Sequence, residues 1–127
     1  MIKPMRTGIA AVYPGTPTMV DAMVAGVRVQ AEWVGAPPGS GELVDVELGI
    51  DVVLGWATAI AIDGGQATLR EGPLLRGTVE VQEQEILTLR IAEGLVQVEV
   101  DDGSIDVPPG TAVAVTAEHL KLYPTGT

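Results

Sequence analysis

Few side chains in this chain of 127 residues are of types that perform chemistry, and the most obvious of them is its one histidine, His119. A histidine that acts as a general base needs a nucleophile within reach. The serine and threonine residues of the chain are not embedded in any catalytic motif. We therefore interpret His119 as a turn or surface residue, expect no catalytic residue, and expect the protein not to be an enzyme.

Oxygen ligands for calcium are the second possibility, in the segment Asp101-Asp102-Gly103-Ser104-Ile105-Asp106. This segment lacks the twelve-residue spacing and the closing glutamate of a calcium loop. The absence of cysteine and the single histidine also exclude thiolate sites and sites that need two imidazoles. A hairpin turn accounts for the aspartates, so we predict no metal site and no cofactor.

Three further groups could bind or react. The carboxylates in Gln82-Glu83-Gln84-Glu85 could do acid–base work, but a solvated loop explains them because nothing apolar nearby would shift a pKa. Trp33 and Trp56 could stack on a sugar or a base. Because the chain has no phenylalanine, we expect both tryptophans to pack in the hydrophobic core instead. The glycine-rich stretch from Gly35 to Gly41 lacks the strand–loop–helix pattern of a phosphate-binding loop. The ligand-binding residues are therefore left unassigned.

The elements that must position these groups are predicted to be β-strands. Apolar and polar residues alternate with a period of two, which gives each strand one apolar and one wet face. Glycine and proline interrupt the chain at short intervals, which is typical of antiparallel sandwiches and barrels. The alternating stretches are 27–33, 44–54, 79–82, 87–91, 96–100 and 113–122. We therefore predict an all-β fold.

Turn residues separate these stretches. Asp63-Gly64-Gly65 and Asp102-Gly103 are hairpin signals, because glycine accepts the positive φ that tight turns require. Ala25-Gly26 and Glu93-Gly94 lie between adjacent strands in the same way. The one helical turn that we expect is Ala117-Glu118-His119, just before the last strand.

An approximate internal repeat is the most specific feature of the sequence. It predicts two tandem five-stranded β-modules that arose by duplication, at residues 1–55 and 77–127, joined by residues 56–76. A superposition should then bring Gly39 near Gly110 and Val46 near Val115. The alternative is a single β-sandwich or barrel with one shared core. The matched segments are Gly8–Val12 with Gly77–Val81, Met23–Val29 with Arg90–Val96, Ala36–Gly39 with Val107–Gly110, Leu43–Val46 with Ala112–Val115, and Ile50–Val52 with Leu120–Leu122.

The second unit contains a sequence pattern in which a Pro-Gly-x-x-Val-x-Val strand is followed by an x-Glu-x-Leu-x-Leu ending. The residues that fit it are Gly110, Val113, Val115, Glu118, Leu120 and Leu122. This pattern resembles that of the transport-associated OB domain of ATP-binding-cassette importers, and that of the free-standing molybdate-binding proteins built from paired copies of that fold. Thr116-Ala117 stands where the family has Arg-Pro, so no ligand residue is carried over. The resemblance implies two OB-like barrels.

Composition limits the partners. Seven basic against seventeen acidic residues give a net charge of −10, and the basic residues are scattered. A phosphate backbone binds through clustered cations, so we expect no binding to nucleic acid. The longest uncharged run without proline, 52–62, is far short of the about 20 residues that span a bilayer. We therefore expect no membrane insertion and a cytoplasmic protein.

These observations give two hypotheses for function. The first is a non-enzymatic module that binds a small ligand, an oxyanion being one option, or that regulates a transporter by docking on one of its subunits. The second is a structural or assembly protein that oligomerises through β surfaces. A hydrolase or isomerase on a β-barrel ranks below both. Exposed strand edges and an aliphatic composition predict a homo-oligomer in either case.

Overall fold

The computed structural model describes residues 4–62 and 72–125, which form eleven strands and no helix. The predicted all-β class is therefore confirmed. The expected Asp63-Gly64-Gly65 turn lies outside the described residues. The strands are β1 (Met5–Tyr13), β2 (Thr18–Val24), β3 (Val27–Trp33), β4 (Leu43–Ile50), β5 (Val53–Leu54), β6 (Ile60–Ile62), β7 (Leu74–Glu83), β8 (Ile86–Ile91), β9 (Gly94–Val100), β10 (Ala112–Thr116) and β11 (Leu120–Pro124).

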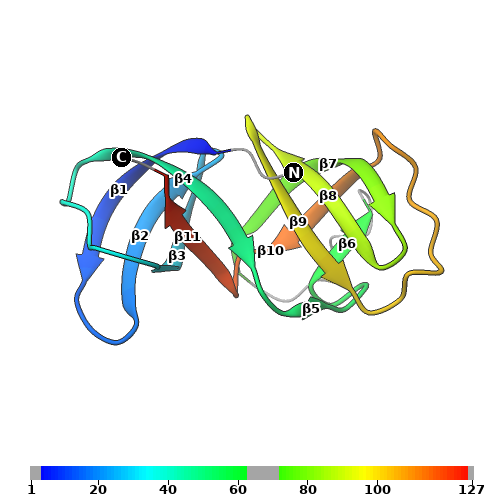
Figure 1. The fold of residues 1–127 in the computed structure, drawn as a ribbon, viewed down its shortest axis with the longest axis horizontal. Coiled ribbons are helices and arrows are strands. Elements are labelled where there is room, and N and C mark those ends of the chain that lie inside the picture. Colours follow the sequence, from blue (N-terminus) through cyan, green and yellow to red (C-terminus); the bar gives the residue numbers. More distant parts are fainter. Residues whose placement is uncertain (1–3, 63–71, 126–127) are drawn as a thin grey trace.

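Five of these strands close into a barrel in the order β1-β2-β3-β11-β4. Strands β1 to β4 come from the beginning of the chain, whereas β11 comes from its end. β11 pairs antiparallel with β4, where Tyr123 lies opposite Glu47, and parallel with β3, where Leu122 lies opposite Trp33. Figure 1 shows β11 within the same lobe as β1 to β4. The C-terminal strand thus completes a barrel built from N-terminal strands.

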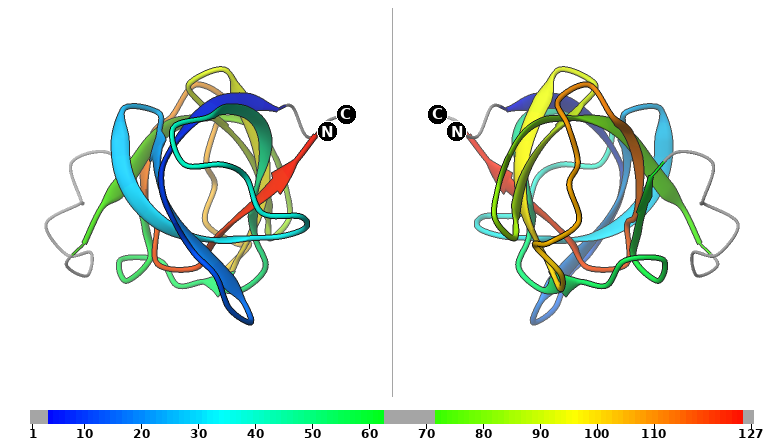
Figure 2. Two further views of the ribbon diagram at one scale, coloured as in Figure 1. Left: turned by 90° about the vertical axis from the view of Figure 1, so that its left-hand side faces the viewer. Right: turned by 90° about the vertical axis from the view of Figure 1, so that its right-hand side faces the viewer.

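The other six strands form a second sheet in the order β5-β9-β8-β7-β10-β6. Here the short strand β5 pairs parallel with β9, as β11 does with β3. The two lobes lie side by side along the long axis of the molecule, and each has a ring-like outline when viewed along that axis (Figures 1 and 2). The predicted ranges 1–55 and 77–127 therefore each contribute strands to both sheets.

The interior is aliphatic, as the composition requires. Burial alternates along several strands, so that Val29, Ala31 and Trp33 on β3 are buried while the residues between them are more exposed. Strand β10 differs, because its residues from Val113 to Thr116 are all buried. Trp33 thus fills the core as expected, and Trp56 is partly buried against it. Three polar residues are also buried, Thr7, Thr88 and Thr116. The Thr7 hydroxyl has no hydrogen-bond partner among the described residues.

Two turns make corresponding backbone hydrogen bonds in the two halves of the sequence. Gly41 and Gly110 occupy the same place in them, with φ of 88° and 89°. The bonds thus pair Gly41, rather than the expected Gly39, with Gly110. Each bond runs from a backbone amide, named first, to a backbone carbonyl. The three bonds of the first turn are Ile9–Glu42, Gly41–Ile9 and Glu42–Gly39. In the same order, the bonds of the second turn are Val79–Thr111, Gly110–Val79 and Thr111–Pro108.

Other local features also occur in both halves. The register of β1 shifts between Ile9 and Ala11, and that of β7 shifts between Val79 and Val81. Such bulges bend a strand and increase its twist, which helps a small sheet to close. Before β11, the expected helical turn is a single turn in which the Leu120 amide donates to the Ala117 carbonyl at 3.2 Å.

Candidate functional site: a groove beside Trp33

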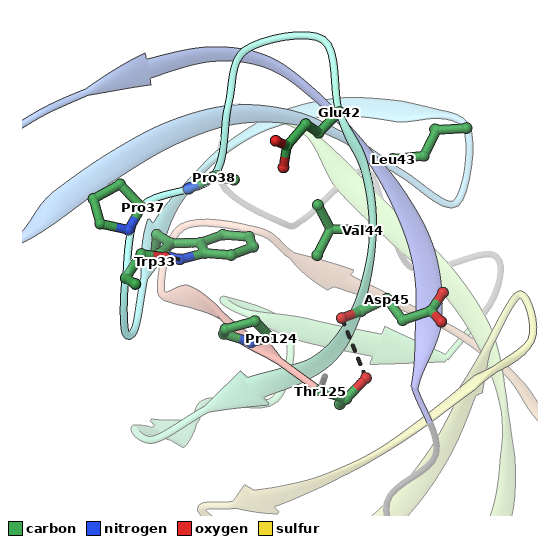
Figure 3. Close-up of a pocket in the computed structure, with 10 residues that line it drawn as sticks. Trp33, Pro37, Pro38, Glu42, Leu43, Val44, Asp45, Pro124 and Thr125 are labelled. Carbon is green, nitrogen blue, oxygen red and sulfur yellow. Dashed lines mark hydrogen bonds between the residues drawn. The ribbon is translucent and has the colours of Figure 1, made fainter. Parts of the chain in front are cut away.

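A groove lies on the closed barrel, where β3 ends and β4 begins. The loop 34–42 crosses over from Trp33 to Leu43, and the end of β11 reaches the same place. The groove encloses about 680 Å³ and is open to solvent. Figure 3 shows its lining, which consists of Trp33, Ala36, Pro37, Pro38, Glu42, Leu43, Val44, Asp45, Pro124 and Thr125.

Trp33 fixes one side of the groove. Its indole Nε1–H donates to the Ala36 carbonyl at 2.7 Å, and the Val34 amide donates to the Leu122 carbonyl at 3.0 Å. Gly35 allows the chain to turn here, with a φ of 114° that side-chain-bearing residues rarely adopt. Trp33 is only 4% exposed. The buried indole therefore forms the floor of the groove, and its hydrogen bond to Ala36 fixes the loop that follows β3.

The end of β11 fixes the opposite side. The Thr125 amide and hydroxyl both donate to the Asp45 carbonyl, at 3.0 and 3.3 Å, and Figure 3 shows the hydroxyl contact. The carboxylate of Asp45 is engaged by Arg6, whose Nε lies 3.3 Å from Oδ1. Because Pro124 ends β11 and Thr125 follows it, the groove exists only when β11 completes the barrel.

Glu42 supplies the remaining charge. In Figure 3 its carboxylate points toward Pro38 and Trp33, over the hollow. No hydrogen bond or ion pair engages this carboxylate within residues 4–62 and 72–125, and no basic residue lines the groove. The site therefore combines apolar side chains with polar atoms and carries one negative charge without a partner among the described residues. Among its lining residues, no nucleophile lies next to a general base.

The other residues singled out from the sequence lie elsewhere. His119 is exposed in the turn before β11 and borders a smaller hollow of about 190 Å³ with Lys121 and Asp51. Within the described residues no hydrogen bond joins its imidazole to a hydroxyl group. Lys121 Nζ and the Tyr123 hydroxyl each lie 3.1 Å from Asp51 Oδ2. Hydrogen bonding to Asp51 raises the pKa of Lys121, and burial, with the same carboxylate, raises that of Tyr123.

The aspartate segment is a turn, but the predicted hairpin is wrong, because no strand starts at Ile105 and the next strand, β10, begins at Ala112 and does not pair with β9. Asp102 Oδ1 accepts hydrogen bonds from the amide and the hydroxyl of Ser104, and these bonds lower the pKa of the Asp102 carboxyl. Asp101 Oδ1 accepts from the Trp56 amide at 3.3 Å, and the Trp56 indole donates to the Asp102 carbonyl at 3.2 Å. In the part of the chain that is described, no three histidine, cysteine or acidic residues gather in a way that could hold a metal ion.

Gln82, from the remaining candidate stretch, has a structural role. Its side chain donates to the Ile105 carbonyl and accepts from the Val107 amide, both at 2.8 Å. It thereby ties β7 to the loop before β10. Glu83 and Glu85 are exposed, as expected of a solvated loop.

Sequence reasoning weighed Trp33 and the stretch from Gly35 to Gly41 separately and missed that they form one groove. The run of proline and glycine directly after a tryptophan was the available signal. Comparisons of the chain with protein-family models, curated proteins and solved structures gave no significant match. None of the described residues forms a helix that could cross a bilayer.

Proposed function

We propose that this protein is a non-enzymatic module that binds a small ligand in the groove beside Trp33. The observation that carries the proposal is the groove itself, with its volume of about 680 Å³ and a lining that combines apolar side chains with polar backbone and carboxylate atoms. Pockets for small molecules typically measure about 300–1,000 Å³ and place a few polar groups among apolar walls. Ligand occupancy would then regulate a transporter subunit on which the module docks, as the resemblance to transport-associated domains suggests. A cytoplasmic location and no binding to nucleic acid remain predictions.

We also infer that the module arose by duplication of one five-stranded unit, followed by exchange of the last strand between the two units. The matching bonds at Gly41 and Gly110 support this inference, as do the bulges in β1 and β7. The parallel pairings β11–β3 and β5–β9 add a third correspondence. In such an arrangement the second sheet is the counterpart of the closed barrel, and neither unit is complete alone.

An oxyanion is one ligand class for such a module, and it would need a different binding place. Glu42 and Asp45 border the groove and no cation lines it, so an anion there would meet repulsion. Backbone amides in turns hold anions without cationic side chains, and this protein has several such turns. An anion that binds away from the groove would keep the module a binding protein while moving its site.

The test is a thermal-shift screen with three sets of compounds: oxyanions (molybdate, sulfate, phosphate), small amines and neutral aromatic alcohols. A compound that binds only the folded protein stabilises it by about 2.7 kcal/mol at a hundredfold excess over its Kd. The groove variant is Val44→Ala, whose side chain points toward the hollow in Figure 3, and the matched control is Val81→Ala, an exposed apolar residue of the second sheet. We expect one set to raise Tm, less so in the Val44 variant. No shift with any compound, or equal shifts in both variants, would contradict binding in the groove.

The alternative function, assembly through β surfaces, also has an observation in its favour. Gly8 on β1 lies opposite both Met23 on β2 and Leu43 on β4, and these two apolar side chains are 44% and 67% exposed. They form a short apolar strip on the outside of the barrel. Sedimentation equilibrium tests this alternative. A multiple of 13.2 kDa that Met23→Glu returns to the single-chain mass would favour assembly, and a 13.2 kDa species would exclude it.

A further inference from the structure

We propose that the ligand of the groove beside Trp33 is a small organic cation, a primary ammonium or guanidinium group on an apolar stem. This inference rests on the proposed function and names the ligand class. It is carried by one charge and its surroundings, namely the Glu42 carboxylate directed over a hollow lined mostly by residues with apolar side chains.

Among the lining residues that the structure describes, Glu42 is the one whose charged side chain has no partner within residues 4–62 and 72–125. The other carboxylate, Asp45, already has Arg6 as its partner at 3.3 Å. The remaining lining residues are apolar except for Thr125, whose hydroxyl is committed to the Asp45 carbonyl. A ligand that satisfies this groove must present a positive charge at the rim and apolar surface below it.

The second sheet does not repeat this chemistry. By the corresponding hydrogen bonds, Thr111 stands where Glu42 stands, and by the pairing of β5 with β9, Val100 stands where Trp33 stands. The carboxylate and the indole thus occur together at only one of the two corresponding places. This contrast indicates that the pairing of the Glu42 carboxylate with the Trp33 indole is specific to the groove and is not required by the β-sheet fold.

The volume of about 680 Å³ and the packed floor favour a free small molecule over a long peptide. Binding of an amine to a carboxylate at an open rim is weakened by solvent and by salt, so its contribution is modest. The apolar walls contribute the rest of the affinity through the surface that they remove from water. The overall charge of −10 adds a long-range attraction for cations.

The experiment is calorimetric titration with three probes on one stem: 2-phenylethylamine, 2-phenylethanol and phenylacetate. We expect the amine to bind about tenfold more tightly than the alcohol at low salt, and the acid not to bind. The variant Glu42→Gln should weaken the amine about threefold and leave the alcohol unchanged. The matched control Glu83→Gln removes the same charge from the exposed end of β7 and should leave both affinities unchanged.

Each other outcome has a definite meaning. Equal binding of amine and alcohol would overturn the cation inference and leave the proposed function standing, because the groove would still bind a ligand. Amine binding that Glu83→Gln weakens as much as Glu42→Gln would overturn it too, since net charge alone would then be acting. An acetylated Pro-Arg-Pro peptide that bound ten times more tightly than every free amine tested would overturn the choice of a small molecule. Failure of all three probes to bind would overturn the inference, and the broader thermal screen would then decide the proposed function.

Discussion

A disulfide between β4 and β11 tests the strand exchange on which the groove depends. Tyr123 lies directly opposite Glu47 in the antiparallel pairing of these strands, and both side chains are half-buried. Residues opposite each other in an antiparallel pair have Cα atoms about 4.5–5.5 Å apart, which a disulfide can bridge. The chain contains no cysteine, so the double variant Glu47→Cys/Tyr123→Cys has one possible intramolecular bond.

The expected gain follows from the loop that this bond closes. Chain-entropy arguments give about 4.5 kcal/mol for a loop of about 76 residues, and engineered bonds usually deliver less. We expect the oxidised variant to exceed its own reduced form by about 2–4 kcal/mol in urea unfolding, and by about 8 °C or more in Tm. Comparison with the reduced form cancels the loss of the Tyr123 side chain.

The matched control is Thr116→Cys/Tyr123→Cys. Thr116 on β10 holds the place that Glu47 holds on β4, because Val115 and Val46 take corresponding positions opposite β7 and β1. If β11 instead stayed with its neighbours in the sequence, this control pair would form the stabilising bond. Oxidation that stabilises the Thr116 pair and not the Glu47 pair would refute the exchange and, with it, the groove.

Three further predictions concern stability and titration. Thr7→Val should stabilise the protein by about 1–2 kcal/mol in urea unfolding, since it removes a buried hydroxyl without a partner, and a loss would show a hydrogen bond there. Gly77→Ala should lower the free energy of unfolding by about 2–3 kcal/mol, because its Cβ would lie 2.3 Å from a backbone carbonyl oxygen of β8. The control Gly8→Ala should cost less, because its Cβ would meet only the Leu43 side chain at 3.6 Å. Equal losses in the two variants would contradict the close packing at Gly77. Ser104→Ala should raise the pKa of Asp102 in a carbon-detected NMR titration. Because the folded pKa of Asp102 is lowered, its small contribution to stability is present above its ordinary pKa and is lost as pH falls through the folded value.

The sequence predicted the strands better than their partners. Alternation in 27–33 identifies β3 and its buried face, and the Ala25-Gly26 turn joins it to β2 with φ of 52° and 78°. Alternation tells which side chains face the core, but it carries no information about which strand lies alongside. The pairing of β11 with β3 and β4 could therefore not be predicted from alternation, although the apolar residues of β11 were correctly expected to be buried.

The candidate site was less predictable for the same reason. Trp33 and Pro37 are close in sequence, but Pro124 joins them only because β11 lies in the closed barrel. The free carboxylate of Glu42 resembles any other surface acid in the sequence, because its lack of a partner is a property of the fold. Some kinds of site could be excluded from the sequence alone, since a chain with one histidine cannot form a metal site that needs two imidazoles.

Ligand binding in the groove beside Trp33 is tested most directly by the two indole N–H signals in a ¹⁵N NMR spectrum. Trp56→Phe assigns them, and one titration with 2-phenylethylamine then reports on both places at once. Ligand binding in the groove predicts a saturable shift of the Trp33 signal, whose N–H bonds to the groove-lining Ala36, with little change at Trp56. A Trp33 signal that stays fixed while Trp56 or neither indole moves, for this amine and for every compound that raises Tm, would contradict it.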